Sequence, residues 1–189
     1  ATSTINDTPG LTPRPFDAAR DGLVLGEGAC TLVLEELEHA RARGAPILAE
    51  IVGFGTNSDG THVTQPNATT MARAMQLALK DAGVSPEAIG YVNAHGTATD
   101  HGDVAETNAT ASVFQRPVPI SSLKSYMGHT LGACGALEAW MTVEMMREGW
   151  FAPTINLKEV DPRCGPLDYI RTGGRDLSTE YAMSNNFAF

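Results

Sequence analysis

The sequence predicts an α/β layered fold in which helices cover a sheet, and two observations carry this prediction. Apolar runs rich in β-branched residues alternate along the chain with segments whose apolar residues recur at helical spacing. An alternating order of strands and helices is typical of a sheet with helices packed on it. No repeat, low-complexity tract or linker interrupts this pattern, so a single domain over residues 1–189 is the simplest organisation.

The individual elements follow from local residue chemistry, beginning with an irregular segment rich in Thr, Pro and Asp over residues 1–22. Strands are expected over residues 30–35, 47–54, 89–94, 118–121, 167–170 and 181–189. Helices are expected over residues 36–43, 69–82, 103–114 and 131–148, with a short helical start at 85–87 and a long polar loop over 57–67. Gly44 and Gly83 are the expected stops of the first two helices.

The composition argues against several classes of function. The formal net charge is −9 and the pI is near 4.9, which gives no basic footprint for nucleic acid or for an anionic membrane surface. No stretch approaches the roughly 18 apolar residues of a membrane-spanning helix. Cys30, Cys134 and Cys164 are an odd number without CxxC spacing, so free thiols and a cytoplasmic location are expected.

Two histidines stand where chemistry is common in α/β folds. His95 directly follows the predicted strand, within the segment Asn-Ala-His-Gly-Thr-Ala-Thr of residues 93–99. His129 lies in Lys-Ser-Tyr-Met-Gly-His-Thr-Leu-Gly-Ala, residues 124–133, at the Gly-rich entry to a helix. A helix amino terminus favours a neutral imidazole or a developing anion. Taken alone, either histidine could instead be a helix cap or a packed core residue.

The other histidines carry less signal. His39 lies in a charged helix, while His62 and His101 lie in polar loops. A zinc site from His95, His101 and His129 would lack the usual HxxxH or paired-cysteine spacing. We therefore expect no firm metal site from these residues.

Together the two histidine segments resemble the paired signature of the β-ketoacyl synthase family. The resemblance covers nearly the whole chain, because further segments match in the family's order. These are Arg-Pro-Phe-Asp at 14–17, Arg-Asp-Gly at 20–22, Gly-Glu-Gly-Ala at 26–29, Ala-Pro-Thr-Ile-Asn at 152–156 and Asn-Asn-Phe-Ala-Phe at 185–189.

The resemblance implies a thiolase-like layered fold, of which this chain is the carboxy-terminal half, a sheet covered by helices. The implied enzyme is an acyltransferase of fatty-acid biosynthesis, a 3-oxoacyl-acyl-carrier-protein synthase. It takes an acyl group onto a cysteine of the amino-terminal half, decarboxylates malonyl-acyl carrier protein and joins the two. The implied partner is acyl carrier protein, with its phosphopantetheine arm and no other cofactor, and the intact enzyme is expected to be a homodimer.

The resemblance also assigns roles to residues. His95 and His129 are the implied catalytic pair that stabilises the enolate oxygen. Lys124 is implied to pair with Glu106, one helical turn after Asp103. Thr97 and Thr99 match hydroxyls that hold the phosphopantetheine arm, and Phe187 and Phe189 match phenylalanines beside the cysteine. A small cation site of some members corresponds to Asn93, Glu138, Ser184 and Asn185.

The sequence departs from the family pattern at several positions. Ala188 replaces a usual Gly, Asn186 a usual Ser, Cys134 a usual Ala or Ser, and Asp100-His101 a Pro-containing pair. None of the cysteines has the Asp-Thr-Ala-Cys neighbours of the family nucleophile, and Cys134 is expected to be inert inside its helix. The chain alone is therefore expected to be an inactive fragment with exposed apolar surface that favours self-association.

Other classes remain open. The chain could belong to a ketosynthase of polyketide or aryl-polyene synthesis, which shares these motifs. A non-catalytic partner of the chain-length-factor type is a further alternative, although such partners commonly lose the two histidines. A thiolase would carry a second catalytic cysteine near its carboxy terminus, where this chain has Phe and Asn.

Overall fold

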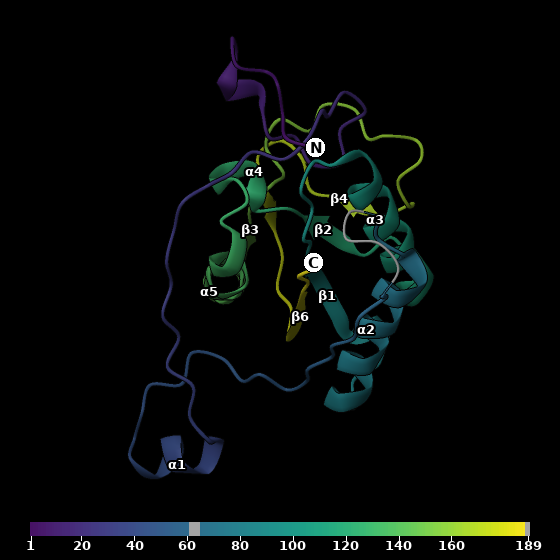
Figure 1. Cartoon of the computed structure of the whole chain (residues 1–189). Helices are drawn as coiled ribbons and strands as arrows, with labels where there is room; N and C mark the ends of the chain where they lie inside the picture. The colour runs from purple at the N-terminus through teal and green to yellow at the C-terminus, as the bar shows by residue number, and fades with distance from the viewer. Residues whose placement is uncertain (61–64, 188–189) are drawn as a thin grey trace.

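The computed structural model describes residues 1–60 and 65–187 (Figure 1). Its helices are α1 (Leu37–Ala42), α2 (Ala68–Ala82), α3 (Asp100–Phe114), α4 (Lys124–Met127) and α5 (Cys134–Glu148). Its strands are β1 (Ile89–Asn93), β2 (Pro119–Ser121), β3 (Trp150–Phe151), β4 (Asp168–Tyr169), β5 (Arg175–Asp176) and β6 (Tyr181–Ser184). Short 3₁₀ helices cover Pro9–Leu11, Pro86–Ala88 and Leu131–Ala133.

A four-stranded parallel sheet forms the centre of the chain, in the order β4-β2-β1-β6. In β1, Val92 pairs with Ile120 on one side and with Met183 on the other. The carboxyl ends of these parallel strands meet at one edge, so the segments that follow β1 and β2 are brought together there. The short strands β3 and β5 form a separate antiparallel pair.

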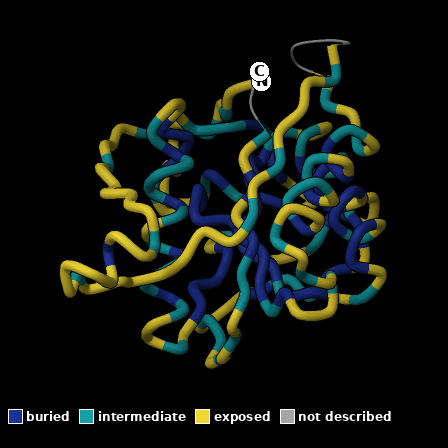
Figure 2. Tube along the Cα trace, turned by 90° about the horizontal axis from the view of Figure 1, so that it is seen from below, coloured by how far each residue is buried: buried dark blue, intermediate teal, exposed yellow. Residues whose placement is uncertain are grey.

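Helices cover both faces of the sheet, as the alternating sequence pattern predicts. Helices α2 and α3 lie on one side and α5 on the other (Figure 1). Met75 and Phe114 pack with Val92 in one core cluster, whereas Tyr91 packs with Met145 in a second cluster. The buried residues accordingly gather in the middle of the body (Figure 2). The predicted α/β layered fold is confirmed.

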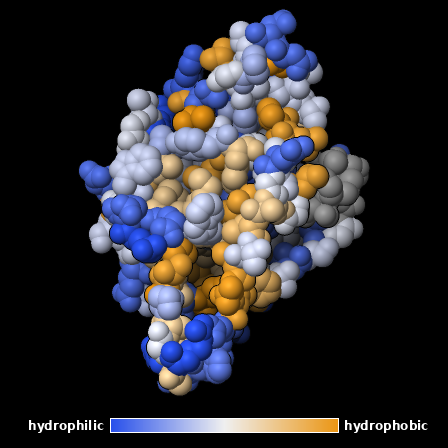
Figure 3. All heavy atoms as spheres, turned by 90° about the vertical axis from the view of Figure 1, so that its left-hand side faces the viewer, coloured by the Kyte–Doolittle hydropathy of each residue, from blue (hydrophilic) through white to orange (hydrophobic). Residues whose placement is uncertain are grey.

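The strands expected over residues 30–35 and 47–54 are wrong. Both segments are extended chain that leaves the body and carries α1 at its far end (Figure 1). A strand needs a neighbour for its backbone N–H and C=O groups, and no described residue pairs with these segments. Val33 and Phe54 are 82% and 70% exposed there. Apolar side chains gather on this face above the polar tip that contains α1 (Figure 3).

The remaining expected elements form with shifted ends. Helix α2 begins where the Asn67 side chain accepts a hydrogen bond from the Thr69 N–H at 2.8 Å, and it stops at Gly83, whose φ is +64°. The helix expected over residues 131–148 divides into a 3₁₀ turn, which begins at Leu131 with a left-handed φ of +53°, and the helix α5. The short pair of β3 and β5 was not expected.

Two expectations fall outside the described residues. His62 lies within residues 61–64, and the end of the strand expected over 181–189 includes Ala188 and Phe189. Within the part of the chain that is described, no helix is long and apolar enough to cross a membrane.

Candidate active site

His95 is held in place through its backbone at the carboxyl end of β1. The N–H groups of His95 and Gly96 both donate to the carboxylate of Glu106 on α3, each at 2.7 Å. The loop also passes close to Ser122, whose hydroxyl donates to the Gly96 carbonyl at 2.7 Å. A Cβ at position 96 would lie 2.6 Å from the Ser122 Cβ, so only glycine allows this approach. The imidazole is therefore carried by a closely packed strand end.

His129 is held from a different part of the chain. Its N–H donates to the Val24 carbonyl at 2.7 Å, and its carbonyl accepts from the Gly26 N–H at 3.0 Å. The ring nitrogen Nδ1 accepts a hydrogen bond from the Leu131 N–H at 3.1 Å. Because a neutral imidazole carries one proton, that proton must then lie on Nε2. His129 thus offers Nε2–H as a donor.

The two histidine rings lie together, edge to face, with centroids 5.2 Å apart. They share the wall of a hollow of about 820 Å³. Burial lowers the pKa of the His95 imidazole well below its ordinary value, and the positive charge of Lys124 acts in the same direction. The same two causes lower the pKa of His129. Both rings are therefore neutral hydrogen-bonding groups at neutral pH.

The predicted ion pair between Lys124 and Glu106 is wrong. The Lys124 ammonium on α4 instead forms a direct ion pair with the carboxylate of Glu138 on α5, and both side chains are buried. The Glu106 carboxylate instead accepts hydrogen bonds from the backbone N–H groups of His95 and Gly96. A buried ammonium needs a carboxylate partner, and the helix-to-helix contact between α4 and α5 provides one.

Glu106 and Asp103 are buried carboxyl groups beneath the loop that follows β1. Burial raises the pKa of Glu106 to about 7, against the lowering effect of the two backbone N–H groups. Burial likewise raises the pKa of Asp103 to about 6. Asp103 accepts the Phe16 N–H at 2.7 Å and the Ala98 N–H at 3.1 Å. These carboxyl groups act on the site by shaping its backbone.

The residues predicted to hold the substrate arm also face the hollow. The hydroxyl oxygens of Thr97 and Thr99 lie 2.9 Å apart, and both residues line the hollow with the histidines. Phe187 lies on the same wall and packs against the main core cluster. Phe189, predicted beside it, lies outside the described residues.

The structure brings three of the four candidate cation ligands together. Asn93 and Ser184 pair across β1 and β6, with the Asn93 amide donating to the Ser184 hydroxyl at 3.2 Å, and Asn93 also interacts with Glu138. Asn93 Oδ1 and Glu138 Oε2 are buried without a hydrogen-bond partner among the described residues. Free oxygens of this kind fit a hard cation. The Asn185 amide instead donates to Met75 Sδ at 3.6 Å.

Sequence reasoning missed a contact between two of the departures from the family pattern. The Cys134 thiol, at the start of α5, donates to Asn186 Oδ1 at 3.1 Å. The Asn186 amide also lines the hollow and influences the pKa values of both His95 and Glu138. Nothing in a single sequence indicates that positions 134 and 186 meet. Each departure is visible in the sequence, but the pairing is not.

Three comparisons with known proteins agree with this geometry. The model of the family described as "Beta-ketoacyl synthase, C-terminal domain" matches residues 48–158. A crystal structure of a β-ketoacyl synthase from Burkholderia phymatum superposes with a TM-score of 0.99 and 73% identity, over 100% of this chain and 46% of that one. A 3-oxoacyl-acyl-carrier-protein synthase 2 from Vibrio cholerae is 48% identical over 100% of this chain.

A further solved structure is described as a type II polyketide acyl carrier protein in complex with its ketosynthase. It is 37% identical with a TM-score of 0.87, over 96% of this chain and 45% of that one. The fold thus places this chain among the thiolase-like ketosynthases of known structure. The chain belongs to the β-ketoacyl synthase family, as its carboxy-terminal domain. It spans about half the length of the curated relatives that it matches, 47% of the Vibrio cholerae protein.

Proposed function

We propose that this chain is the carboxy-terminal half of a 3-oxoacyl-acyl-carrier-protein synthase, an acyltransferase of fatty-acid biosynthesis. The observation that carries the proposal is the pair of neutral imidazoles, 5.2 Å apart on the wall of one hollow. The name of the Vibrio cholerae relative supports the reaction, and the 47% coverage supports the view that a nucleophile-bearing half lies elsewhere in the enzyme.

The decarboxylation step requires hydrogen-bond donors at the thioester oxygen of the malonyl group. When malonyl-acyl carrier protein loses carbon dioxide, the electrons of the broken carbon–carbon bond move into an enolate and its oxygen gains negative charge. The Nε2–H of His129 is one donor for that oxygen, because Nδ1 already accepts from Leu131. The imidazole of His95 is the second proposed hydrogen-bonding group at the enolate oxygen. Removal of a single such donor from an oxyanion site typically costs about a hundredfold or more in rate.

Condensation completes the reaction. The enolate carbon attacks the acyl thioester carried by a cysteine of the amino-terminal half, and the cysteine leaves as a thiolate. Cys134 is a poor substitute for that nucleophile, because burial raises the pKa of its thiol and its S–H is donated to Asn186. This chain by itself is therefore proposed to be inactive.

The phosphopantetheine arm of the substrate indicates which partner protein the enzyme binds. Thr97 and Thr99 place two hydroxyls beside the histidines, where they suit the amides of a phosphopantetheine arm. We therefore propose acyl carrier protein as the partner, with no cofactor beyond that arm. The complex described for the related polyketide ketosynthase supports this partner. A homodimer in the cytoplasm is the proposed state of the whole enzyme.

One experiment tests this function and separates it from the alternatives. The full-length gene product and this chain are each supplied with malonyl-acyl carrier protein and a series of acyl-acyl carrier proteins. We expect 3-oxoacyl product from the full-length protein with saturated acyl chains, and none from this chain alone. A preference for poly-β-keto or aryl-polyene intermediates would indicate a ketosynthase of polyketide or aryl-polyene synthesis. Complete inactivity of the folded full-length protein would favour the non-catalytic partner.

A further inference from the structure

The loop of residues 96–99, which links His95 to α3, is held in a strained conformation. Ala98 has a left-handed φ of +63°, which a residue with a Cβ rarely adopts. Such a conformation persists only where the surroundings fix it. The Ala98 N–H donates to the Asp103 carboxylate at 3.1 Å, and the Thr99 carbonyl accepts the Asp103 backbone N–H at 3.3 Å. A further residue holds the carbonyls at the far end of the loop through its side chain.

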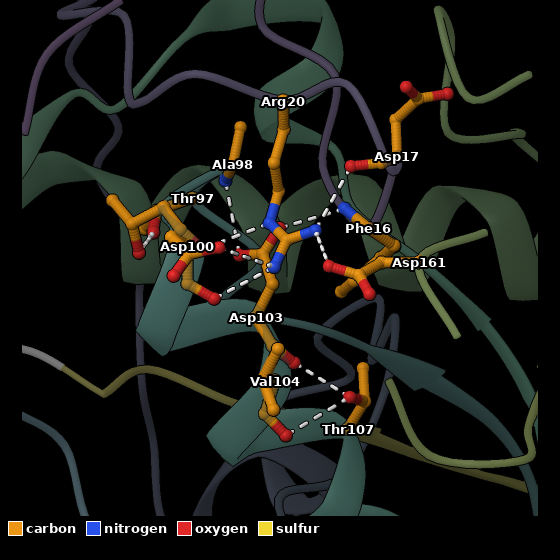
Figure 4. Close-up of polar contacts among 12 residues, drawn as sticks. Phe16, Asp17, Arg20, Thr97, Ala98, Asp100, Asp103, Val104, Thr107 and Asp161 are labelled. Atoms are coloured by element: carbon orange, nitrogen blue, oxygen red, sulfur yellow. Dashed lines mark hydrogen bonds and ion pairs between the residues drawn. The ribbon is translucent and has the colours of Figure 1, made fainter. Parts of the chain in front are cut away.

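Arg20 holds the far end of this loop from a distant part of the chain (Figure 4). Its Nε donates to the Thr99 carbonyl at 3.1 Å, and its Nη2 donates to the Asp100 carbonyl at 2.7 Å. Its Nη1 donates to the Asp17 carbonyl at 3.0 Å and to Asp161 Oδ2 at 2.7 Å. One planar guanidinium thus joins three segments that are far apart in sequence.

The guanidinium is buried, so its charge must be compensated inside the protein. The Arg20 side chain is 1% exposed, and its Nε lies 3.5 Å from Asp103 Oδ2. Asp161 is the second carboxylate partner and is itself 4% exposed. Asp103 also holds the Ala98 N–H, so the same buried ion cluster fixes the loop from both ends. The histidine chemistry uses none of these charges.

We propose that Arg20 is a positioning residue for the substrate arm, because it fixes the 96–99 loop and with it the Thr97 and Thr99 hydroxyls. The role rests on the proposed function, in which these hydroxyls hold the phosphopantetheine arm. Arg20 touches neither the hollow's histidines nor the reacting atoms. Its loss therefore acts on substrate binding more than on the chemical step.

Arg163 is a matched control in the same cluster. It contacts Asp161 and Asp100 through their side-chain oxygens, as close as 2.7 Å and 2.5 Å. Its side chain is 56% exposed, and none of its hydrogen bonds within the described residues reaches a carbonyl of the 96–99 loop. A substitution of Arg163 therefore disturbs the same carboxylates without releasing the loop.

The test compares Arg20→Lys with Arg163→Lys in the full-length gene product. Lysine keeps the charge beside Asp161 but cannot donate to the Thr99 and Asp100 carbonyls together. We expect Arg20→Lys to raise KM for malonyl-acyl carrier protein about tenfold, which corresponds to about 1.4 kcal/mol, with kcat little changed. Arg163→Lys should leave both parameters unchanged. Faster amide hydrogen exchange at residues 97–99 is expected in Arg20→Lys alone.

The outcomes separate this proposal from the proposed function. If the parent protein does not condense, the proposed function fails, and the exchange measurement still reports on the loop. Equal exchange at residues 97–99 in both variants, or a loss of kcat with KM unchanged, would overturn the positioning role. Should Arg20→Lys not fold, Asp161→Asn removes one anchor of Arg20. It must then raise KM while Arg163→Lys does not, or the proposal is wrong.

Discussion

The imidazole rings of His95 and His129 meet edge to face, with their planes at 87° and their centroids 5.2 Å apart. They come from different parts of the fold, one from the end of β1 and the other from the turn between α4 and α5. Two neutral rings can face one another at this distance without charge repulsion. Their shared protonation state is therefore the property on which the site depends.

Both rings are expected to stay neutral at a pH where an ordinary histidine is half protonated. Burial and Lys124 lower the pKa values of His95 and His129 from the ordinary value of about 6.5. The native state then binds fewer protons than the unfolded state just below pH 6.5, so these rings reduce stability as the pH falls. Imidazole ¹⁵N shifts measured from pH 8 to pH 6.5 should report neutral rings; charged rings near pH 6.5 would contradict the account.

Glu106 is expected to shape the pH dependence of stability in the opposite sense. Its pKa is raised to about 7 by burial, from an ordinary value near 4.5. Between these values the native state holds more protons than the unfolded state, so this group's contribution to stability falls as the pH rises. Glu106→Gln removes that term. Urea unfolding should show a larger stability deficit of the variant at pH 5 than at pH 7.5.

The reverse order of these two deficits would show that the carboxylate form of Glu106 is the one that the fold favours. A suitable control is Glu148→Gln, which removes a carboxyl group at the exposed end of α5.

The buried pair of Lys124 and Glu138 should be sensitive to the loss of one partner. Lys124→Met leaves the Glu138 carboxylate buried without its ammonium, which should reduce the free energy of unfolding by about 3–5 kcal/mol. The double variant Lys124→Met with Glu138→Leu should recover part of this loss. Chemical unfolding of the three proteins is the measurement.

The exposed pair of Arg147 and Glu144 on α5 provides the comparison. Arg147 is 51% exposed, so Arg147→Met should cost less than about 1 kcal/mol. If Lys124→Met were equally mild, the buried ion pair would not be a structural requirement of the site.

The extended segments around α1 should make this chain associate with itself. Val33 and Ile51 are 82% and 70% exposed, and neither segment has a strand partner among the described residues. Sedimentation velocity should therefore detect oligomers of the chain. Val33→Lys with Ile51→Lys should shift the population toward monomer.

Thr31→Lys adds the same kind of charge at an exposed polar position in the same segment, and it should have a smaller effect. A parent chain that remains monomeric at high concentration would contradict this expectation.

Many of the helices and strands can be predicted from the sequence, because each produces a local pattern of apolar residues. The apolar run at β1 and the helical spacing in α2 each identify an element without its neighbours. The segments over 30–35 and 47–54 have the same local signal, but a strand also requires a partner. The periodicity of a sequence does not say whether that partner is present.

In the candidate site, local motifs likewise predict some residues, whereas the contacts between distant residues are not predicted. The motifs identify His95 and His129, and the structure places them together. The partner of Lys124 was predicted wrongly, because Glu106 and Glu138 are both buried carboxylates on helices near the site and only packing selects between them. The contacts of Arg20 with the Thr99 and Asp100 carbonyls were not foreseen, because backbone carbonyls carry no sequence signal.

The central claim is that His95 and His129 stabilise the enolate formed from a malonyl thioester. Its most direct test is carbon dioxide release from malonyl-acyl carrier protein by the full-length gene product and its His95→Ala and His129→Ala variants. We expect each variant to lose about a hundredfold or more of the rate while remaining folded. Release at the parent rate by either folded variant would contradict the account.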